Sequence, residues 1–287
     1  MTTLAEVAAY RPKDIDEALE AMRSALDFFH REQDQRAIFL RAYYLITLAV
    51  HQAVYRRGRY SNRIFFDEAW IKRLAGKFSS LYFQSLTTGE RPGERAWKLA
   101  HRLAASGESS VFQDMLLGLN AHINYDLAYG IYLNLKEFED GREHLLLPRR
   151  KFDHDQVNNI LVNSIPLIQE VLTRDYGGEM LALGELVGSL DELLAGVGLK
   201  YYRERVWWTA ISYLSTTSQE EVQLVHDRLD WESAQLAESI ACEGTPLQRS
   251  LRGMLNLFSK DDFGPIVLER EEAEAPKKPP EQTVSPF

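Results

Sequence analysis

The chain has 287 residues, of which 45% are hydrophobic, and a formal net charge of −9 at pH 7. This acidic balance argues against a broad nucleic-acid interface, which would need clustered lysine and arginine. The single cysteine, Cys242, excludes an intrachain disulfide and a cysteine-based zinc cluster.

The beginning of the chain has no basic stretch followed by an apolar run, so we expect no secretory signal. No uncharged apolar run reaches the length of about 18 residues that a transmembrane helix needs. These features predict a cytoplasmic protein with no membrane span. The oligomeric state is left open.

Helical periodicity dominates the chain, because apolar residues recur at three- and four-residue spacings. No stretch alternates with a period of two, so we predict no sheet. The predicted helices are, in chain order, Ile15–Phe29, Asp34–Arg57, Phe65–Leu86, Arg95–Ala105, Val111–Phe138, Phe152–Thr173, Glu179–Leu194, Tyr201–Leu214, Glu220–Ala241 and Pro246–Phe258.

The sequence therefore predicts an all-α fold, a single compact bundle of roughly nine to ten helices. Asp14 is expected to cap the first helix and Gly58 to end the second. Pro148 should open the helix that begins near Phe152, and Pro166 should kink or split it. Residues 1–264 form the predicted domain, with a candidate subdomain break near 139–150. Residues 265–287 form a predicted disordered tail, because they are charged and rich in proline.

The predicted helix over Val111 to Lys136 carries polar residues where an apolar core is expected. It has no lysine or arginine before its last residue, yet Asn120, His122, Asn124 and Asp126 lie in its apolar middle. Burying such groups without partners costs roughly 1–3 kcal/mol each. The segment therefore either closes a polar network in the core or builds a site.

His122 and Asp126 are four residues apart and so can meet on one face of a helix. A carboxylate beside an imidazole fixes its tautomer and orients it as a general base. The same pair could supply two ligands to a divalent metal, the only cofactor that the sequence indicates. It could also be a structural pair that locks two helices together. His30/Asp34 and His226/Asp230 repeat the spacing, but we expect a cap at Asp34 and a solvated face around His226.

Further polar residues are candidates for binding a substrate. The amides of Asn120 and Asn124 could hold a substrate oxygen. Thr47 either bonds its own helix or lines a pocket. Asp153 either caps its helix or points toward His122 together with Asn158. Arg203 could neutralise Asp126, clamp a substrate carboxylate or lie on the surface.

The eight residues Asn120 to Leu127 (NAHINYDL) resemble the signature of a bacterial domain family of unknown function, DUF5995. Weaker similarities extend the resemblance over residues 14–215, among them Phe66-Asp67 and the segment Arg203 to Trp207. The resemblance implies an all-helical domain with a polar centre and brings no settled activity. The His122/Asp126 spacing is also similar to ligand pairs of zinc-dependent phospholipases C and single-strand nucleases, whose His-x-x-x-Glu motif is absent here.

Two functions fit these observations. The preferred one is an enzyme with hydrolase- or lyase-type chemistry on a small, partly apolar substrate, using His122, Asp126 and the asparagine amides. The alternative is a helical protein that binds a ligand or partner without catalysis, in which the polar cluster is structural.

Overall fold

The computed structural model describes residues 2–87, 94–137, 143–177 and 197–241, with the side chains of 143–145 and 197–199 left out. All regular elements within these ranges are helices, so the predicted all-α fold is confirmed. They are α1 (Leu4–Ala8), α2 (Ile15–Arg31), α3 (Arg36–Val54), α4 (Glu68–Ser85), α5 (Arg95–Ser106), α6 (Val111–Ala121), the π-helix η1 (His122–Asp126), α7 (Leu127–Lys136), α8 (Glu143–Tyr176), α11 (Val197–Leu214) and α12 (Gln219–Ala241).

Side-chain caps set several helix starts. The predicted cap Asp14 accepts hydrogen bonds from the backbone amides of Asp16 and Glu17, both at 3.0 Å. Ser110 and Gln113 form a capping box at the start of α6, in which each side chain bonds the other's backbone amide. Gly107 ends α5 at φ +66°, a left-handed conformation that glycine adopts without strain.

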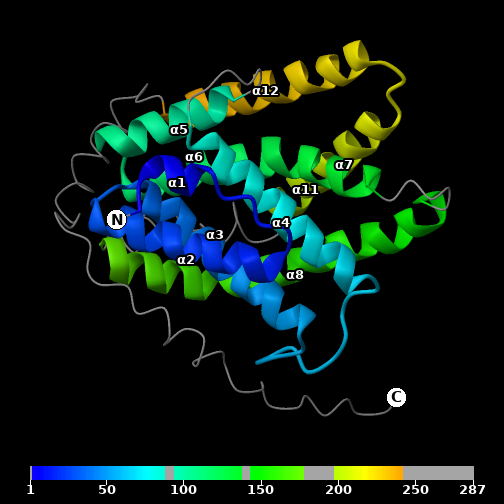
Figure 1. The fold of residues 1–287 in the computed structure, drawn as a ribbon, viewed down its shortest axis with the longest axis horizontal. Coiled ribbons are helices and arrows are strands. Elements are labelled where there is room, and N and C mark those ends of the chain that lie inside the picture. Colours follow the sequence, from blue (N-terminus) through cyan, green and yellow to red (C-terminus); the bar gives the residue numbers. More distant parts are fainter. Residues whose placement is uncertain (1, 88–93, 138–142, 178–196, 242–287) are drawn as a thin grey trace.

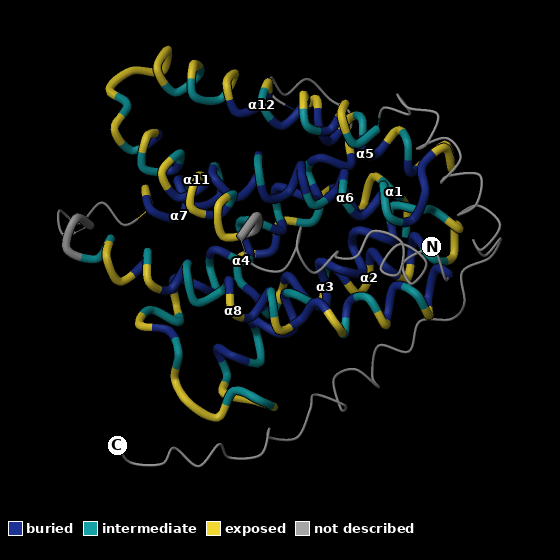
Figure 2. Tube along the Cα trace, turned by 180° about the vertical axis from the view of Figure 1, so that it is seen from behind, coloured by how far each residue is buried: buried dark blue, intermediate teal, exposed yellow. Residues whose placement is uncertain are grey.

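Helix α3 lies at the centre of the bundle. It packs against α2, α8 and α6, and Figure 2 shows it buried over most of its length. Among the described residues α3 is the one helix long and apolar enough to cross a membrane, but 83% of that apolar window is buried inside the fold. Burial of this extent is typical of a helix in a protein core, and the described residues indicate no multi-span membrane protein.

The helices α6, η1 and α7 follow one another as one track through the middle of the molecule (Figure 1). The track contacts α3 and α4 on one side and α5, α11 and α12 on the other. Gly118 allows α3 to come close, because a β-carbon on it would lie 2.3 Å from Cγ of Phe39. The polar residues that begin near Asn120 are therefore enclosed by neighbouring helices.

Two local predictions are wrong in detail, and a third is decided only in part. The helix predicted to run to Arg57 ends at Val54, and Arg56 already has a left-handed φ of 55°. Pro148 does not open a helix but lies within α8, where its missing amide removes only one backbone hydrogen bond. Pro166 does not split α8, and a kink at this proline stays a prediction. Arg59 donates to the carbonyl of Asn163 at 3.1 Å, one turn before the proline.

Some predictions lie outside the described residues. These are the helices Glu179–Leu194 and Pro246–Phe258 and the tail 265–287. Helix α8 begins at Glu143, within the expected break near 139–150, and a subdomain boundary there stays a prediction, as does a single domain over 1–264.

Candidate functional site

The candidate site is built on the π-helix between α6 and α7. This segment spans His122 to Asp126 and so carries both predicted catalytic residues. Single π-turns within α-helices often mark functional sites, because they turn a side chain away from the regular α-helical direction. His122 and Asp126 are each only 3% exposed, so their contacts are made with protein groups in the core.

The imidazole of His122 is held in one tautomer by Asp126. Its Nδ1 lies 3.2 Å from Oδ2 of Asp126, and Nε1 of Trp97 donates to the same oxygen at 2.9 Å. Burial holds the pKa of His122 well below its ordinary value, so the ring is neutral. A neutral ring whose Nδ1–H donates to Asp126 presents a lone pair at Nε2. That Nε2 is buried and has no hydrogen-bond partner among the described residues.

Aromatic rings fix the position of this imidazole. The ring of Phe78 stacks on it at a centroid distance of 3.5 Å and an interplanar angle of 11°. The ring of Tyr43 contacts the imidazole edge-on, with a distance of 4.1 Å between the ring centroids. Burial raises the pKa of Tyr43 well above its ordinary value, and the nearby charge of Asp126 raises it further, so the phenol stays protonated. The imidazole can therefore turn little, and Nε2 keeps its direction.

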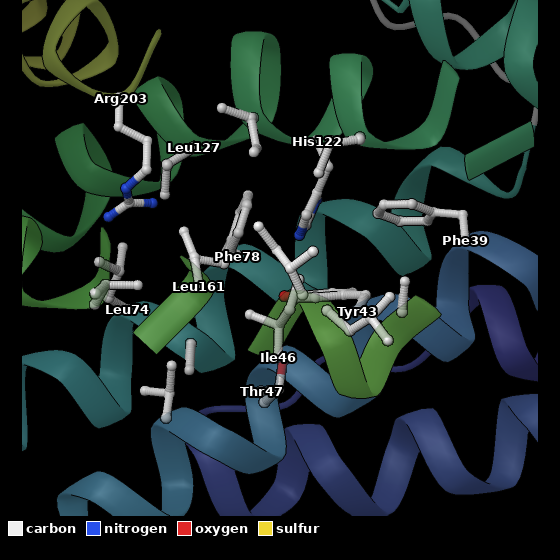
Figure 3. A pocket seen from close by; sticks show the side chains of 18 of the residues that line it. Phe39, Tyr43, Ile46, Thr47, Leu74, Phe78, His122, Leu127, Leu161 and Arg203 are labelled. Carbon is white, nitrogen blue, oxygen red and sulfur yellow. The ribbon is translucent and has the colours of Figure 1, made fainter. Parts of the chain in front are cut away.

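His122 lines an apolar cavity of about 140 Å³, whose wall residues come from α3, α4, the α6–η1–α7 track, α8 and α11. Figure 3 shows a ring nitrogen of His122 pointing into the space above Tyr43 and Ile46. Aliphatic and aromatic side chains form most of the wall. The polar side chains on it are those of Tyr43, Thr47, His122, His154, Gln169 and Arg203.

A second polar group lies at the other end of the cavity. Arg203 on α11 is 5% exposed and donates from Nε to Oδ1 of Asn158 at 2.6 Å. Its Nη2 donates to the carbonyl oxygen of His154 at 2.8 Å and lies 3.2 Å from Nδ1 of the same residue. Nε2 of His154 lies 3.1 Å from the Arg203 carbonyl oxygen. These bonds make Nε2 of His154 the donor and Nδ1 the acceptor, and burial lowers the pKa of this neutral imidazole.

A family model described as a family of unknown function, DUF5995, matches residues 15–242. The chain belongs to this family. No curated protein and no solved structure matches the sequence.

Not all predicted site residues of this DUF5995 chain meet at the cavity. His122, Thr47 and Arg203 line it, and Asp126 and Asn158 stand behind His122 and Arg203.

The two asparagines of the signature face away from the cavity. Asn120 donates to the carbonyl of Ser233 on α12 at 2.9 Å, and Asn124 donates to the side chain of Asn120 at 2.9 Å. Asp153 accepts from the backbone amides of Phe66 and Asp67, both at 2.7 Å. Burial raises the pKa of Asp153, and these two amide hydrogen bonds oppose the rise. The predicted roles of Asn120, Asn124 and Asp153 in binding a substrate stay predictions that this geometry does not favour.

Metal ligation gains no further support in this DUF5995 chain. Within the described ranges, no group of three or more histidine, cysteine, aspartate or glutamate side chains could hold a metal ion. His122 and Asp126 bond each other, which leaves Nε2 of His122 as the nitrogen directed toward the cavity. A catalytic zinc takes three ligands from the protein, and Nε2 of His122 would supply one.

Sequence reasoning missed Trp97 as a partner of Asp126 and did not place Tyr43 and Phe78 beside His122. Trp97 is one apolar residue in the pattern of a short amphipathic helix, and nothing in that pattern indicates an indole nitrogen bonded to a carboxylate 29 residues away.

Proposed function

We propose that this protein is an enzyme that binds a small, largely apolar molecule in the cavity and uses His122 as a general base. The single observation that supports this proposal is the neutral, buried imidazole whose Nδ1 is bonded to Asp126 while its Nε2 has no hydrogen-bond partner in the described part of the chain. A lone pair left unpaired in the core costs stability, and such costs are concentrated at functional sites.

In the proposed reaction, Nε2 of His122 takes a proton from water or from the substrate itself, which gives hydrolase- or lyase-type chemistry. Asp126 holds the imidazole in the reactive tautomer and stabilises the positive charge that develops on it. Trp97 positions Asp126 by donating to the same carboxylate oxygen. The hydroxyls of Tyr43 and Thr47 are available to stabilise negative charge on a substrate oxygen.

A second candidate function is ligand binding without catalysis, in the cytoplasm as the composition predicts. The apolar wall favours it, because no carboxylate or thiol is among the described residues that line the cavity. Beyond His122, few groups there could drive a reaction. The same cavity would then serve as a carrier or sensor site.

Hydrolysis of phenyl acetate by the full-length protein tests the proposal. In His122→Asn the amide nitrogen can replace Nδ1 as donor to Asp126, while the acceptor Nε2 is lost. Loss of a general base lowers rates by about 10²–10⁴-fold, so we expect a drop of at least about 100-fold. The control is His51→Asn, because His51 also bonds an aspartate, Asp16 at 3.0 Å, but does not line the cavity.

Equal hydrolysis by the wild type and His122→Asn would contradict the role of His122. If the wild type binds phenyl acetate without hydrolysing it, the result would instead support the second candidate function, ligand binding without catalysis.

A further inference from the structure

Among the described residues, no carboxylate forms an ion pair with the charge of Arg203. Its hydrogen bonds go to the uncharged side chain of Asn158 and to His154. The carboxylate of Asp155 is close enough to raise the pKa of Arg203, and Glu204 is its neighbour in the chain, but both carboxylates bond Nζ of Lys151, at 2.6 Å and 2.7 Å. Within the described part of the chain, neither carboxylate therefore forms an ion pair with the buried guanidinium.

The guanidinium nevertheless stays charged. Burial lowers the pKa of Arg203 to about 10, which is still well above neutral pH. A buried charge without an opposite charge is costly, because it has lost its hydration and gained no ion pair. Nη1 of Arg203 makes no hydrogen bond among the described residues, so one donor group is available to a ligand.

We propose that the ligand of the cavity is a small carboxylate whose charged group binds Arg203 and whose apolar body fills the space toward His122. This inference shares one premise with the proposed function, namely that a ligand binds in the cavity. Arg203 is the one charged side chain among the described residues that line the cavity, since His122 and His154 are neutral. An anionic group therefore finds one place to bind, which fixes the orientation of the ligand.

The shape of the cavity supports this orientation. In Figure 3 the Arg203 guanidinium and the His122 imidazole enter from opposite ends, with Leu127 and Phe78 between them. A cavity of about 150 Å³ holds benzene in a comparable protein core, so the 140 Å³ here fits an apolar body of that size. A bond near the far end of the ligand would then lie beside Nε2 of His122.

Binding of benzoate, benzamide and toluene to the full-length protein tests the inference, by calorimetry at neutral pH. Benzoate and benzamide have nearly the same shape and differ in charge, while toluene reports on the apolar cavity alone. We expect benzoate to bind at least about 10-fold more tightly than benzamide, since charge-assisted hydrogen bonds to arginine are roughly twice as strong as neutral ones. In Arg203→Met this preference should vanish while toluene still binds.

Two results separate this inference from the function proposed above. If toluene binds and benzoate binds no more tightly than benzamide, the proposal that the ligand is a carboxylate would be overturned. The cavity would still be a binding site for an apolar molecule. Failure of all three probes to bind the wild type would overturn both. If Arg203→Met does not fold, Arg203→Lys keeps the charge but loses the planar guanidinium, and the wild-type comparison of benzoate with benzamide still decides.

Discussion

At the scale of single residues, the contact between His122 and Asp126 depends on more than their spacing. Three His-x-x-x-Asp pairs occur in the sequence, but among the described residues only this one forms the contact that the spacing allows. His30 and His226 bond tyrosine hydroxyls of other helices instead, at 2.8 Å and 2.7 Å. Spacing therefore predicts which side chains can meet, and tertiary packing decides whether they do.

The same limit applies to the residues around the imidazole. The apolar surroundings of His122 in the sequence predicted its burial correctly. They could not predict that Trp97 would bond its carboxylate partner or that Phe78 would stack on its ring, because both lie on other helices.

The hydrogen bond from Trp97 to Asp126 can be measured against a matched tryptophan. Trp70 is also fully buried, but its Nε1 has no hydrogen-bond partner among the described residues. Replacing either indole by phenylalanine removes similar volume, so the difference between the two variants reports the hydrogen bond. Bonds to charged groups contribute about 1.5–3 kcal/mol, and we expect Trp97→Phe to be less stable than Trp70→Phe by that amount in urea unfolding. Equal losses would show that the indole does not support Asp126.

At the scale of helices, the sequence predicts one element where the structure has three. The apolar pattern over Val111–Phe138 indicates a single helix, and this stretch forms α6, η1 and α7. A change from α- to π-helical hydrogen bonding over five residues leaves the apolar composition unaltered, so periodicity does not reveal it. The positions of side chains around η1 therefore differ from those that a regular spacing of about 100° per residue gives.

Two glycines in helices differ in the space that their neighbours leave for a side chain. A β-carbon on Gly76 would lie 2.3 Å from the backbone carbon of Lys13, whereas one on Gly130 would meet Leu81 at an ordinary 3.6 Å. Both glycines lie inside helices, where alanine is favoured by about 1 kcal/mol. We expect Gly130→Ala to raise the free energy of unfolding by up to about 1 kcal/mol. Gly76→Ala should lower it by about 1–3 kcal/mol, because the backbone must move apart.

Thermal or urea unfolding of the two variants measures this difference. A Gly76→Ala protein as stable as the wild type would show that α4 and the segment before α2 are not in close contact.

At the scale of the whole molecule, helical periodicity was sufficient to predict the all-α fold. It was not sufficient to predict which helices neighbour the α6–η1–α7 track. Asn120 bonds α12 and His122 faces the cavity because α12 and α3 lie on different sides of that track. That arrangement depends on contacts between segments that are distant in the sequence.

Buried histidines make the stability of the molecule depend on pH. Burial lowers the pKa of His122 and His154 well below the ordinary 6.5, and that of His101 to about 3. Below pH 6.5 the unfolded chain binds protons at these residues that the folded chain does not. The free energy of unfolding therefore falls as the pH decreases from 6.5, by up to about 1.4 kcal/mol per pH unit for each histidine, and for His101 the fall continues to about pH 3.

The central claim is that His122 is neutral and presents to a cavity that a ligand can enter an Nε2 with no hydrogen-bond partner within the described ranges. Nitrogen NMR of histidine-labelled protein tests it most directly, in a titration from about pH 8 to pH 5 with and without phenol, whose hydroxyl can donate to Nε2. We predict that His122 stays neutral with its proton on Nδ1 throughout, and that phenol shifts the Nε2 resonance. Protonation of His122 near pH 6.5, or an Nε2 resonance that saturating phenol leaves unchanged, would contradict the claim.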